Sequence, residues 1–520
     1  MTDAHQGSQV TAAKTPSTSS KFDDGEEVVS PYHVTSAPYH GENAKAAQLA
    51  ATASASDFTP AELKRVLRKI DCILMPIMCV AVLMQFLDKT SLNYASLLGL
   101  KKDTHLKGQE YSWLGSFFYV GYLIATPIHG FFLQKVRLSR YVAVCIALWA
   151  VSLGAHVACK NYGQLVAVRL LLGWFEAALT PAFILLTGRF YTKQEQVTRT
   201  SIWFANNGWA QILGGGISYA LQVQKTSHLK VWQQMYLILG GIALLFGIVV
   251  LLFMPDSPAT IRYLDERERQ VAVFRIKQNK SGIHDTTWKW DQLYEAIRDP
   301  RLYMFFLAVC SANIANGGVS NFSSAIISAF HYDNKTTALL GMAPGGMEVV
   351  AVYFGAWLSY KTRTRVIPGV LMYLIAIVGG IMMIAIPPHA NAGRYVGFVV
   401  LFCYPVASPY LYSLSGSVSG TTKRIVFNTV LQVGYSTGNL IGPQTYRAKD
   451  APNYVPAKIT IIAMFGFAAA CLSAIGATHY LWNKRNGTLS SANDDGKQIE
   501  DHEDLTDLTD KQRATFRYPY

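Results

Sequence analysis

Three charged residues lie inside long apolar stretches of this sequence. Arg169 and Glu176 occur in LVAVRLLLGWFEAALTPAFILL, and Asp88 occurs in CILMPIMCVAVLMQFLDKTSLNYASL. A charge at the centre of a membrane helix costs roughly 2.5–3.5 kcal/mol on translocon scales, so such residues persist where they pair or line a water-filled path. The seven-residue spacing of Arg169 and Glu176 places both side chains on one helix face, about 10 Å apart along the axis. We expect this face to look into a cavity that an ion or a solute uses.

The elements that position these charges are membrane helices. The chain has 520 residues, of which 51% are hydrophobic and 15% are charged. Stretches of about 20 apolar residues predict membrane spans. Twelve occur, at residues 72–97, 112–134, 141–159, 162–186, 199–222, 234–254, 302–328, 339–359, 366–386, 395–416, 425–446 and 457–482. The sequence therefore predicts an all-α membrane protein with twelve transmembrane helices, arranged six and six around a polar centre.

The loops indicate the orientation and the outer boundaries. Lys and Arg cluster in every second loop, which predicts that both termini are cytoplasmic, and the protein is expected in the plasma membrane. The predicted parts are a disordered cytoplasmic tail (1–58), an N-terminal six-helix bundle (59–254), a cytoplasmic linker (255–300), a C-terminal six-helix bundle (301–485) and an acidic cytoplasmic tail (486–520). Thr59 is predicted to cap an amphipathic helix on the inner surface, and the C-terminal tail is predicted to be mobile.

Charge and cysteine content bound the possible partners. The formal net charge of +13 is spread over short loops and forms no continuous stripe, so it indicates topology and lipid contact and not nucleic-acid binding. The seven cysteines lie in or beside apolar spans without metal-ligand spacing, and we expect neither a metal nor a cofactor. The expected partners are the lipid bilayer, a small organic anion and protons, with no obligate protein partner.

The depth of each charge suggests a role. Asp88 and Arg169 lie at similar depth, near the outer half of spans 1 and 4, so they could pair. Glu176 lies deeper, beyond the reach of Arg169 and with no cation expected in direct contact. An unpaired carboxylate in low dielectric favours its neutral form, so Glu176 is a candidate proton carrier. Asp88 would compete with a substrate carboxylate for the planar Arg169 fork.

Other readings of these residues remain open. Asp88, Lys89 and Arg169 could form a static ion-pair cluster that only locks helices. Glu348 in span 8 is a weaker candidate for proton coupling. Several asparagines lie inside spans, where they bind a solute or hydrogen-bond between helices; Asn207, Asn316 and Asn439 are the candidates for solute binding, with Lys89 and Arg169. Glycines in spans 5 and 11, the same ordinal position in each half, favour close helix contacts in an internally repeated protein.

Several sequence segments together resemble the fungal allantoate permease family, in the anion:cation symporter group of the major facilitator superfamily. They are FLDKTSLNYASLLGL, YSWLGSFFYVGYLIATPIHGFFLQKVRLSRY, VRLLLGWFEAALTPAF, MPDSPATIRYLDERER, NGGVSNFSSAIISAF, GNLIGPQTYRAKDAPNY and LTDKQRATFRY. The resemblance covers about residues 60–485 and the last few residues. It implies the major facilitator fold of two six-helix bundles, alternating access and proton-driven uptake of small organic anions. It also implies proton coupling by Asp88 and Glu176 and anion contact by Arg169. The segment GFFLQKVRLSR lacks the Asp of the superfamily's gating motif.

Rival functions leave different sequence signals. A proton-antiport exporter of this superfamily would carry a Gly-Pro pair in span 5, where Gly208-Trp209 stands instead. A nutrient sensor would carry a large added cytoplasmic domain. Motifs of metalloenzymes, serine hydrolases and ATP-binding loops are missing from the sequence, which argues against an enzyme or an ATP-driven pump. The resemblance leaves the substrate open among ureido acids, vitamins and small peptides.

Overall fold

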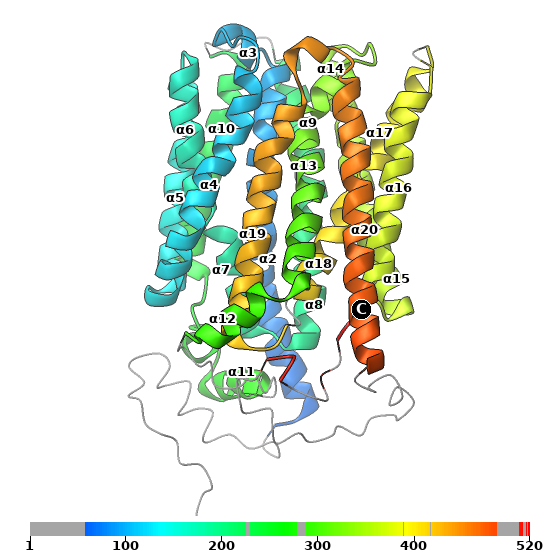
Figure 1. The fold of residues 1–520 in the computed structure, drawn as a ribbon. Helices are drawn as coiled ribbons and strands as arrows, with labels where there is room; N and C mark the ends of the chain where they lie inside the picture. Colours follow the sequence, from blue (N-terminus) through cyan, green and yellow to red (C-terminus); the bar gives the residue numbers. More distant parts are fainter. Residues whose placement is uncertain are drawn as a thin grey trace, which may run out of the picture.

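The structure is a computed structural model, and it describes residues 58–224, 229–277, 288–387, 389–415, 418–485, 509–512, 516 and 518–520. The predicted tail before Phe58 lies outside these residues. Long helices run side by side between two ends of the molecule (Figure 1). We call one end the linker end, because it carries α11 (Glu266–Lys277) and α12 (Trp290–Ile297), and the other the far end, because it carries α3 (Leu100–Asp103) and α14 (Asn334–Leu340). The described residues contain no strand, as the sequence predicts.

The membrane helices follow the predicted spans. The N-terminal half contains α2 (Pro60–Leu97), α4 (Glu110–Lys135), α5 (Leu138–Ala155), α6 (Tyr162–Glu176), α7 (Leu179–Phe190), α8 (Lys193–Phe204), α9 (Asn206–Val223) and α10 (Val231–Phe253). The C-terminal half contains α13 (Pro300–Ser328), α15 (Met342–Thr362), α16 (Val366–Ala385), α17 (Asn391–Leu401), α18 (Ala407–Ser415), α19 (Thr421–Ile441) and α20 (Val455–Arg485). Ten segments of the described chain are long and apolar enough to cross a membrane. The remaining two predicted spans, α8 with α9 and α19, are helical but more polar.

Several spans are broken into two helices, and proline explains two of the breaks. The ring of Pro181 removes the donor that would bond to the Ala177 carbonyl, and α6 accordingly ends at Glu176. Pro405 similarly lies in the interruption between α17 and α18. The break after α6 leaves Glu176 at a helix end inside the protein.

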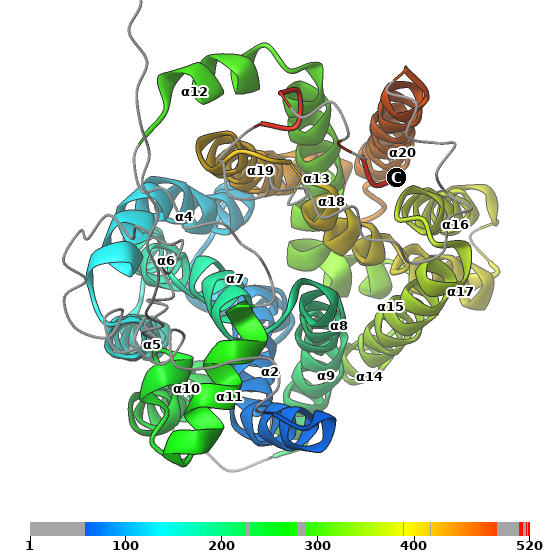
Figure 2. The same ribbon diagram turned by 90° about the horizontal axis from the view of Figure 1, so that it is seen from below.

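Seen along the helix axes, the two halves lie side by side (Figure 2). They meet where α9 packs against α15, α4 against α19, and α2 against α13. The α9–α15 contact is tight, because a Cβ atom built on Gly208 would lie 2.5 Å from the Gly345 carbonyl oxygen. Glycine at both positions allows the two backbones to approach this closely.

Hydrogen bonds join the two halves near the far end. The Asn93 amide donates to Ser323 and accepts from the Ser324 backbone, and the Tyr111 hydroxyl donates to the Asn321 carbonyl. Ser116 donates to the carbonyl of Leu440. These contacts close the molecule at its far end.

Two predictions about the ends of the chain need correction. Thr59 does cap the first helix, with Glu62 completing a capping box, but the amphipathic segment continues into the membrane span as one 38-residue helix. The prediction of a mobile C-terminal tail is wrong for residues 509–512 and 518–520, which pack against the C-terminal half. Thr509 and Asp510 are 0% and 1% exposed.

Candidate functional site

Asp88 and Lys89 are consecutive on α2, and their side chains point to different neighbours because consecutive helical residues are about 100° apart. The Asp88 carboxylate accepts a hydrogen bond of 2.7 Å from the Trp149 indole on α5 and one of 3.4 Å from Ser91. The Lys89 ammonium instead faces α6 and α19. One helix thus presents an acid to the interior of the N-terminal half and a base to the boundary between the halves.

Lys89 forms an ion pair with Glu176. Its Nζ atom lies 3.3 Å from Glu176 Oε1, and the Glu176 side chain is fully buried. The expectation that no cation directly contacts Glu176 is therefore wrong. The two carboxylate oxygens accept no hydrogen bond from the described residues. The pair is electrostatic in character and is held in a site where desolvation opposes both charges.

The expected contact between Asp88 and Arg169 is not formed in the described part of the chain. Arg169 is 2% exposed, and its guanidinium donates a 2.8 Å hydrogen bond to the Tyr236 hydroxyl on α10. The Tyr236 ring stacks on His156, with ring centroids 4.4 Å apart. Arg169 is therefore positioned by an aromatic pair, while Asp88 is positioned by Trp149.

Lys89 also bridges the two halves. Its ammonium donates a 2.8 Å hydrogen bond to the Tyr435 hydroxyl on α19. The Tyr435 ring packs against two tyrosines of α4, with ring-centroid distances of 6.1 Å to Tyr119 and 6.0 Å to Tyr122. A polar contact surrounded by aromatic rings thus crosses the boundary at the level of the charged residues.

Asparagines extend the polar group into the C-terminal half. The Asn316 amide donates to Asn439, which in turn donates to Asn313, both over 2.9 Å. The Tyr404 hydroxyl donates to Asn316 over 2.6 Å. Asn439 and Tyr435 are one turn apart on α19, so this amide chain continues the group that begins at Lys89. The partly exposed Asn207 on α9 forms no hydrogen bond with this group among the described residues.

Glu348 occupies a second contact between the halves. It is 1% exposed on α15, and one carboxylate oxygen accepts a 3.2 Å hydrogen bond from the Gln211 amide of α9. The other oxygen has no hydrogen-bond partner in the described residues. The weaker candidate acid thus lies at the tight α9–α15 crossing and not beside Lys89.

The site contains aromatic residues in addition to the charged residues and asparagines that the sequence predicts. Trp149, Tyr236, Tyr404 and Tyr435 each hold one of the candidate residues by a hydrogen bond. A polar aromatic inside a membrane span, such as Tyr435 beside Gly434, is the sequence signal that could have identified them. Formally, the four central charges balance, since Lys89 and Arg169 oppose Asp88 and Glu176.

The site contains no constellation suited to a metal. Among the residues that the structure describes, no group of three or more His, Cys, Asp or Glu side chains could hold an ion.

A surface cavity of about 440 Å³ lies away from this site, beside the first turns of α2, and is lined by Lys64, Arg68 and Tyr263. It lies about 30 Å along α2 from Lys89 and is separate from the central group.

Comparisons with known proteins identify related chains. The sequence model of the Major Facilitator Superfamily matches residues 78–443. The allantoate permease of Saccharomyces cerevisiae is 32% identical over 91% of this chain and 90% of its own length. The thiamine pathway transporter of the same yeast is 31% identical over 88% of this chain and 86% of its own length. An uncharacterized transporter of Schizosaccharomyces pombe is 35% identical over 89% of this chain and 90% of its own length.

A solved structure shares the arrangement of helices. The crystal structure of a bacterial homolog to the human lysosomal transporter Spinster, in an inward-facing and unoccupied conformation, matches with a TM-score of 0.59. The match covers 81% of this chain and 98% of the bacterial chain at 13% identity. At this identity the likeness concerns the fold alone.

Proposed function

The chain belongs to the Major Facilitator Superfamily and, within it, to the allantoate permease family, and on that premise we propose that it imports a small organic anion together with protons. The protein is a multi-pass membrane transporter and not an enzyme. The direction of transport, the coupling to protons and the class of substrate are the parts that we propose.

The observation that carries the proposal is the buried contact of Lys89 with both Glu176 and Tyr435. A proton that binds Glu176 cancels its attraction for Lys89. The ammonium is then free to bind a substrate anion beside Tyr435, where it otherwise has an internal counterion. Proton binding and anion binding thus favour each other. Protonation of Glu176 leaves the buried Lys89 ammonium without a counterion, and a bound anion supplies one.

Arg169 provides the second anion contact in this scheme. The guanidinium uses one Nη atom to hold Tyr236 and keeps further donors for a carboxylate, which it can bind through two parallel hydrogen bonds. Asp88, held by Trp149 and not in contact with Arg169, is a second buried carboxylate in the same half. In this scheme Asp88 and Glu176 serve proton coupling, and Arg169 and Lys89 serve substrate binding.

The amide chain suits a substrate of the ureido acid class. A molecule such as allantoate has one carboxylate and several ureido N–H and C=O groups. Asn316 and Asn439 present both donors and acceptors, so they can pair with such groups after their mutual hydrogen bond opens. The name of the allantoate permease relative agrees with this class. Asn207 approaches a substrate only if α9 moves.

Alternating access follows from the contacts between the halves. The hydrogen bonds at the far end close that side. We propose that the linker end, which we place in the cytoplasm, is the side that opens while the far end is closed. We place both termini in the cytoplasm from the distribution of basic loops, and we propose that the protein lies in the plasma membrane. Opening of the far end then requires the α9–α15 and α4–α19 contacts to separate.

Uptake by transport-deficient yeast cells tests the proposal. Labelled allantoate and a series of small carboxylates would be supplied at acidic and neutral external pH, with and without a protonophore. We expect one class of anion to accumulate against its gradient at acidic pH, and we expect the protonophore to abolish the accumulation. Export of the anion from preloaded cells, stimulated by external acid, would instead establish the antiport alternative.

A further inference from the structure

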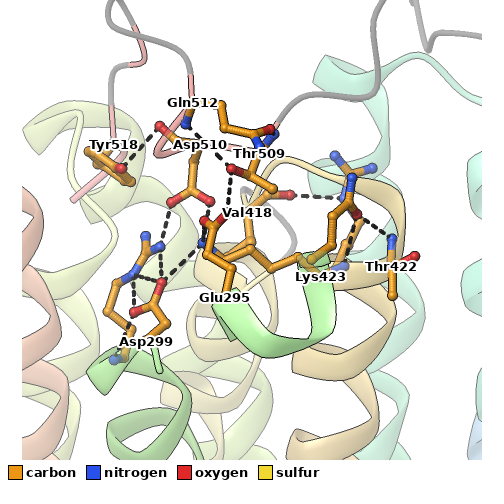
Figure 3. Close-up of polar contacts among 12 residues, drawn as sticks. Glu295, Asp299, Val418, Thr422, Lys423, Thr509, Asp510, Gln512 and Tyr518 are labelled. Atoms are coloured by element: carbon orange, nitrogen blue, oxygen red, sulfur yellow. Dashed lines mark hydrogen bonds and ion pairs between the residues drawn. The ribbon is translucent and has the colours of Figure 1, made fainter. Parts of the chain in front are cut away.

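Two buried cations lie at the linker end of the C-terminal half. Arg301 is in the first turn of α13 and is 1% exposed, and Lys423 is in the first turn of α19 and is fully buried. Two buried carboxylates face them. One is Asp299, the residue that caps α13, and the other is Asp510, which comes from the C-terminal segment more than 80 residues after Lys423 (Figure 3).

Asp510 connects the two cations. One of its oxygens pairs with the Arg301 guanidinium, and the other lies 2.6 Å from the Lys423 ammonium. Asp299 contacts both cations as well, at 2.6 Å from Arg301 and 3.1 Å from Lys423. Two buried positive charges are thus balanced by two buried negative charges, and the C-terminal segment supplies one of them.

The pKa of Asp510 reflects this environment. Burial raises it, but the attraction of Arg301 and Lys423 outweighs burial and lowers the pKa below its ordinary value. Asp510 therefore stays charged, and the ion pairs stay formed, throughout the physiological range of pH.

The linker helix α12 is part of the same assembly. Gln292 accepts hydrogen bonds from the backbone of Thr422 and Lys423, at the N-terminus of α19, where unpaired N–H groups require acceptors. Glu295 accepts from Lys423 over 2.7 Å and from the Thr509 hydroxyl over 2.8 Å. The C-terminal segment therefore contacts α12 and α19 at one point.

The end of the segment is fixed to α20. Asn483 exchanges two hydrogen bonds of 2.8 Å with the backbone of Tyr518, and the Pro519 carbonyl lies 2.5 Å from the His479 ring. The Tyr518 ring also lies near Arg301, whose guanidinium carbon is 5.0 Å from the ring centroid. Four helices, α12, α13, α19 and α20, thus share the contacts of one short segment.

We propose that residues 509–512, 516 and 518–520 form a releasable strap that fastens α12 to the C-terminal half, with Asp510 as the residue that holds it, and that transport requires the strap to be fastened. We call these residues the strap. The helices whose first turns it neutralises, α13 and α19, are the helices that carry Asn316 and Tyr435. Release of the strap leaves two buried cations with one buried carboxylate below the candidate site, which loosens the packing that positions these side chains.

The sequence supplies a matched control. The C-terminal sequence contains two consecutive Leu-Thr-Asp triplets, and the second of them ends at Thr509 and Asp510, which make the contacts above. Asp510→Asn and Thr509→Glu both disturb the second triplet, the first by removing its charge and the second by placing a carboxylate beside Glu295. Asp507→Asn and Thr506→Glu make the same chemical changes in the preceding triplet.

Limited trypsin digestion of the purified full-length protein tests whether the strap is docked. Cleavage after Lys511 would be followed by mass spectrometry, with cleavage after Lys497 as an internal reference, and labelled-substrate uptake would be measured in parallel. We expect Asp510→Asn and Thr509→Glu to accelerate cleavage after Lys511 by at least about tenfold, because hydrogen bonds to charged groups are lost. We expect the same two variants to lose most of their uptake and both controls to behave as the wild type.

Two results would overturn the proposal. Protection of Lys511 in Asp510→Asn equal to that of the wild type would show that Asp510 does not hold the strap. Faster cleavage with unchanged uptake would show that transport does not require it. If Asp510→Asn does not give a monodisperse protein, Thr509→Glu, which keeps both ion pairs of Asp510 chemically possible, decides the question alone.

Discussion

The ammonium of Lys89 lies 3.3 Å from the carboxylate of Glu176 and joins α2 to the end of α6 inside the N-terminal half. The same ammonium donates to Tyr435 in the C-terminal half. A change in the charge of Glu176 therefore reaches the boundary between the halves through one side chain. In the proposed mechanism, this relationship makes the pair the element that couples proton binding to the boundary between the halves.

The ion pair predicts a non-additive effect on stability. Lys89→Met leaves the buried Glu176 carboxylate without its cation, which costs about 3–5 kcal/mol for a buried pair. We expect a lower thermal unfolding midpoint for Lys89→Met and recovery of most of the loss in Lys89→Met with Glu176→Leu, measured by fluorescence in detergent. Lys335→Met, at an exposed position of α14, is the control and should leave the midpoint unchanged. Additive losses in the double variant would show that the two residues do not act as a pair.

The contacts of Arg169 predict that a lysine, which keeps only the charge, cannot replace it. Arg169→Lys keeps the positive charge but loses the planar guanidinium. Only the guanidinium can hold Tyr236 and at the same time present two parallel donors to a carboxylate. We expect uptake to fall nearly to background while the amount of protein in the membrane, measured by quantitative immunoblot, stays normal. Normal uptake by Arg169→Lys would make the residue a structural ion and would place the substrate carboxylate elsewhere.

The close crossing of α9 and α15 predicts a shift between conformations. A methyl group at Gly208 meets the Gly345 carbonyl at 2.5 Å, and overpacking of this kind costs about 1–3 kcal/mol. Gly208→Ala should therefore favour opening at the far end. A thiol introduced at Ser323, in a cysteine-free background, should react faster with a water-soluble reagent. Gly216→Ala on the same helix is the control, because its methyl group meets nothing within 4 Å. In this variant the thiol at position 323 should react at the same rate as in the background that keeps both glycines. Equal rates for both would refute the role of this crossing.

The strap predicts a defined dependence on pH. Burial raises the pKa of Asp299, but hydrogen bonding and attraction by Arg301 outweigh it and lower the pKa to about 2, and Asp510 is lowered as well. Carboxylates with lowered pKa contribute stability that is full above their unfolded pKa, about 3.9, and that is lost as pH falls through the folded value. The difference in unfolding midpoint between the wild type and Asp510→Asn should accordingly be constant from about pH 5 to pH 8 and shrink only below about pH 4. A difference that shrinks near pH 6 would contradict this assignment.

Hydropathy was sufficient to predict the helices, and it was not sufficient to predict the contacts of their charges. Membrane spans are set by about 20 apolar residues, which a sequence shows directly, and the family resemblance is confirmed by the relatives. The pairing of Lys89 with Glu176 depends on the rotation of α2 about its axis. Asp88 and Lys89 are adjacent in sequence, and a rotation of 100° decides which of them meets α6.

The strap was missed for a related reason. Its acidic, polar sequence is typical of a solvated tail, and only the position of two buried cations on α13 and α19 makes one of its carboxylates favourable inside the protein. Arg301 and Lys423 stand just before predicted membrane spans, where basic residues ordinarily face the aqueous side. Their burial depends on how four helix ends assemble, which no local pattern records.

The central claim, that Glu176 carries the coupled proton, is tested most directly by comparing two modes of transport in membrane vesicles of Glu176→Gln. Glutamine keeps the shape of the side chain but removes the charge that Lys89 meets. We predict that the variant exchanges labelled for unlabelled anion in counterflow at a rate close to that of the wild type. It should nevertheless fail to accumulate the anion when an inward proton gradient is imposed. Accumulation driven by the proton gradient in Glu176→Gln would contradict the account and would move the coupling role to Glu348.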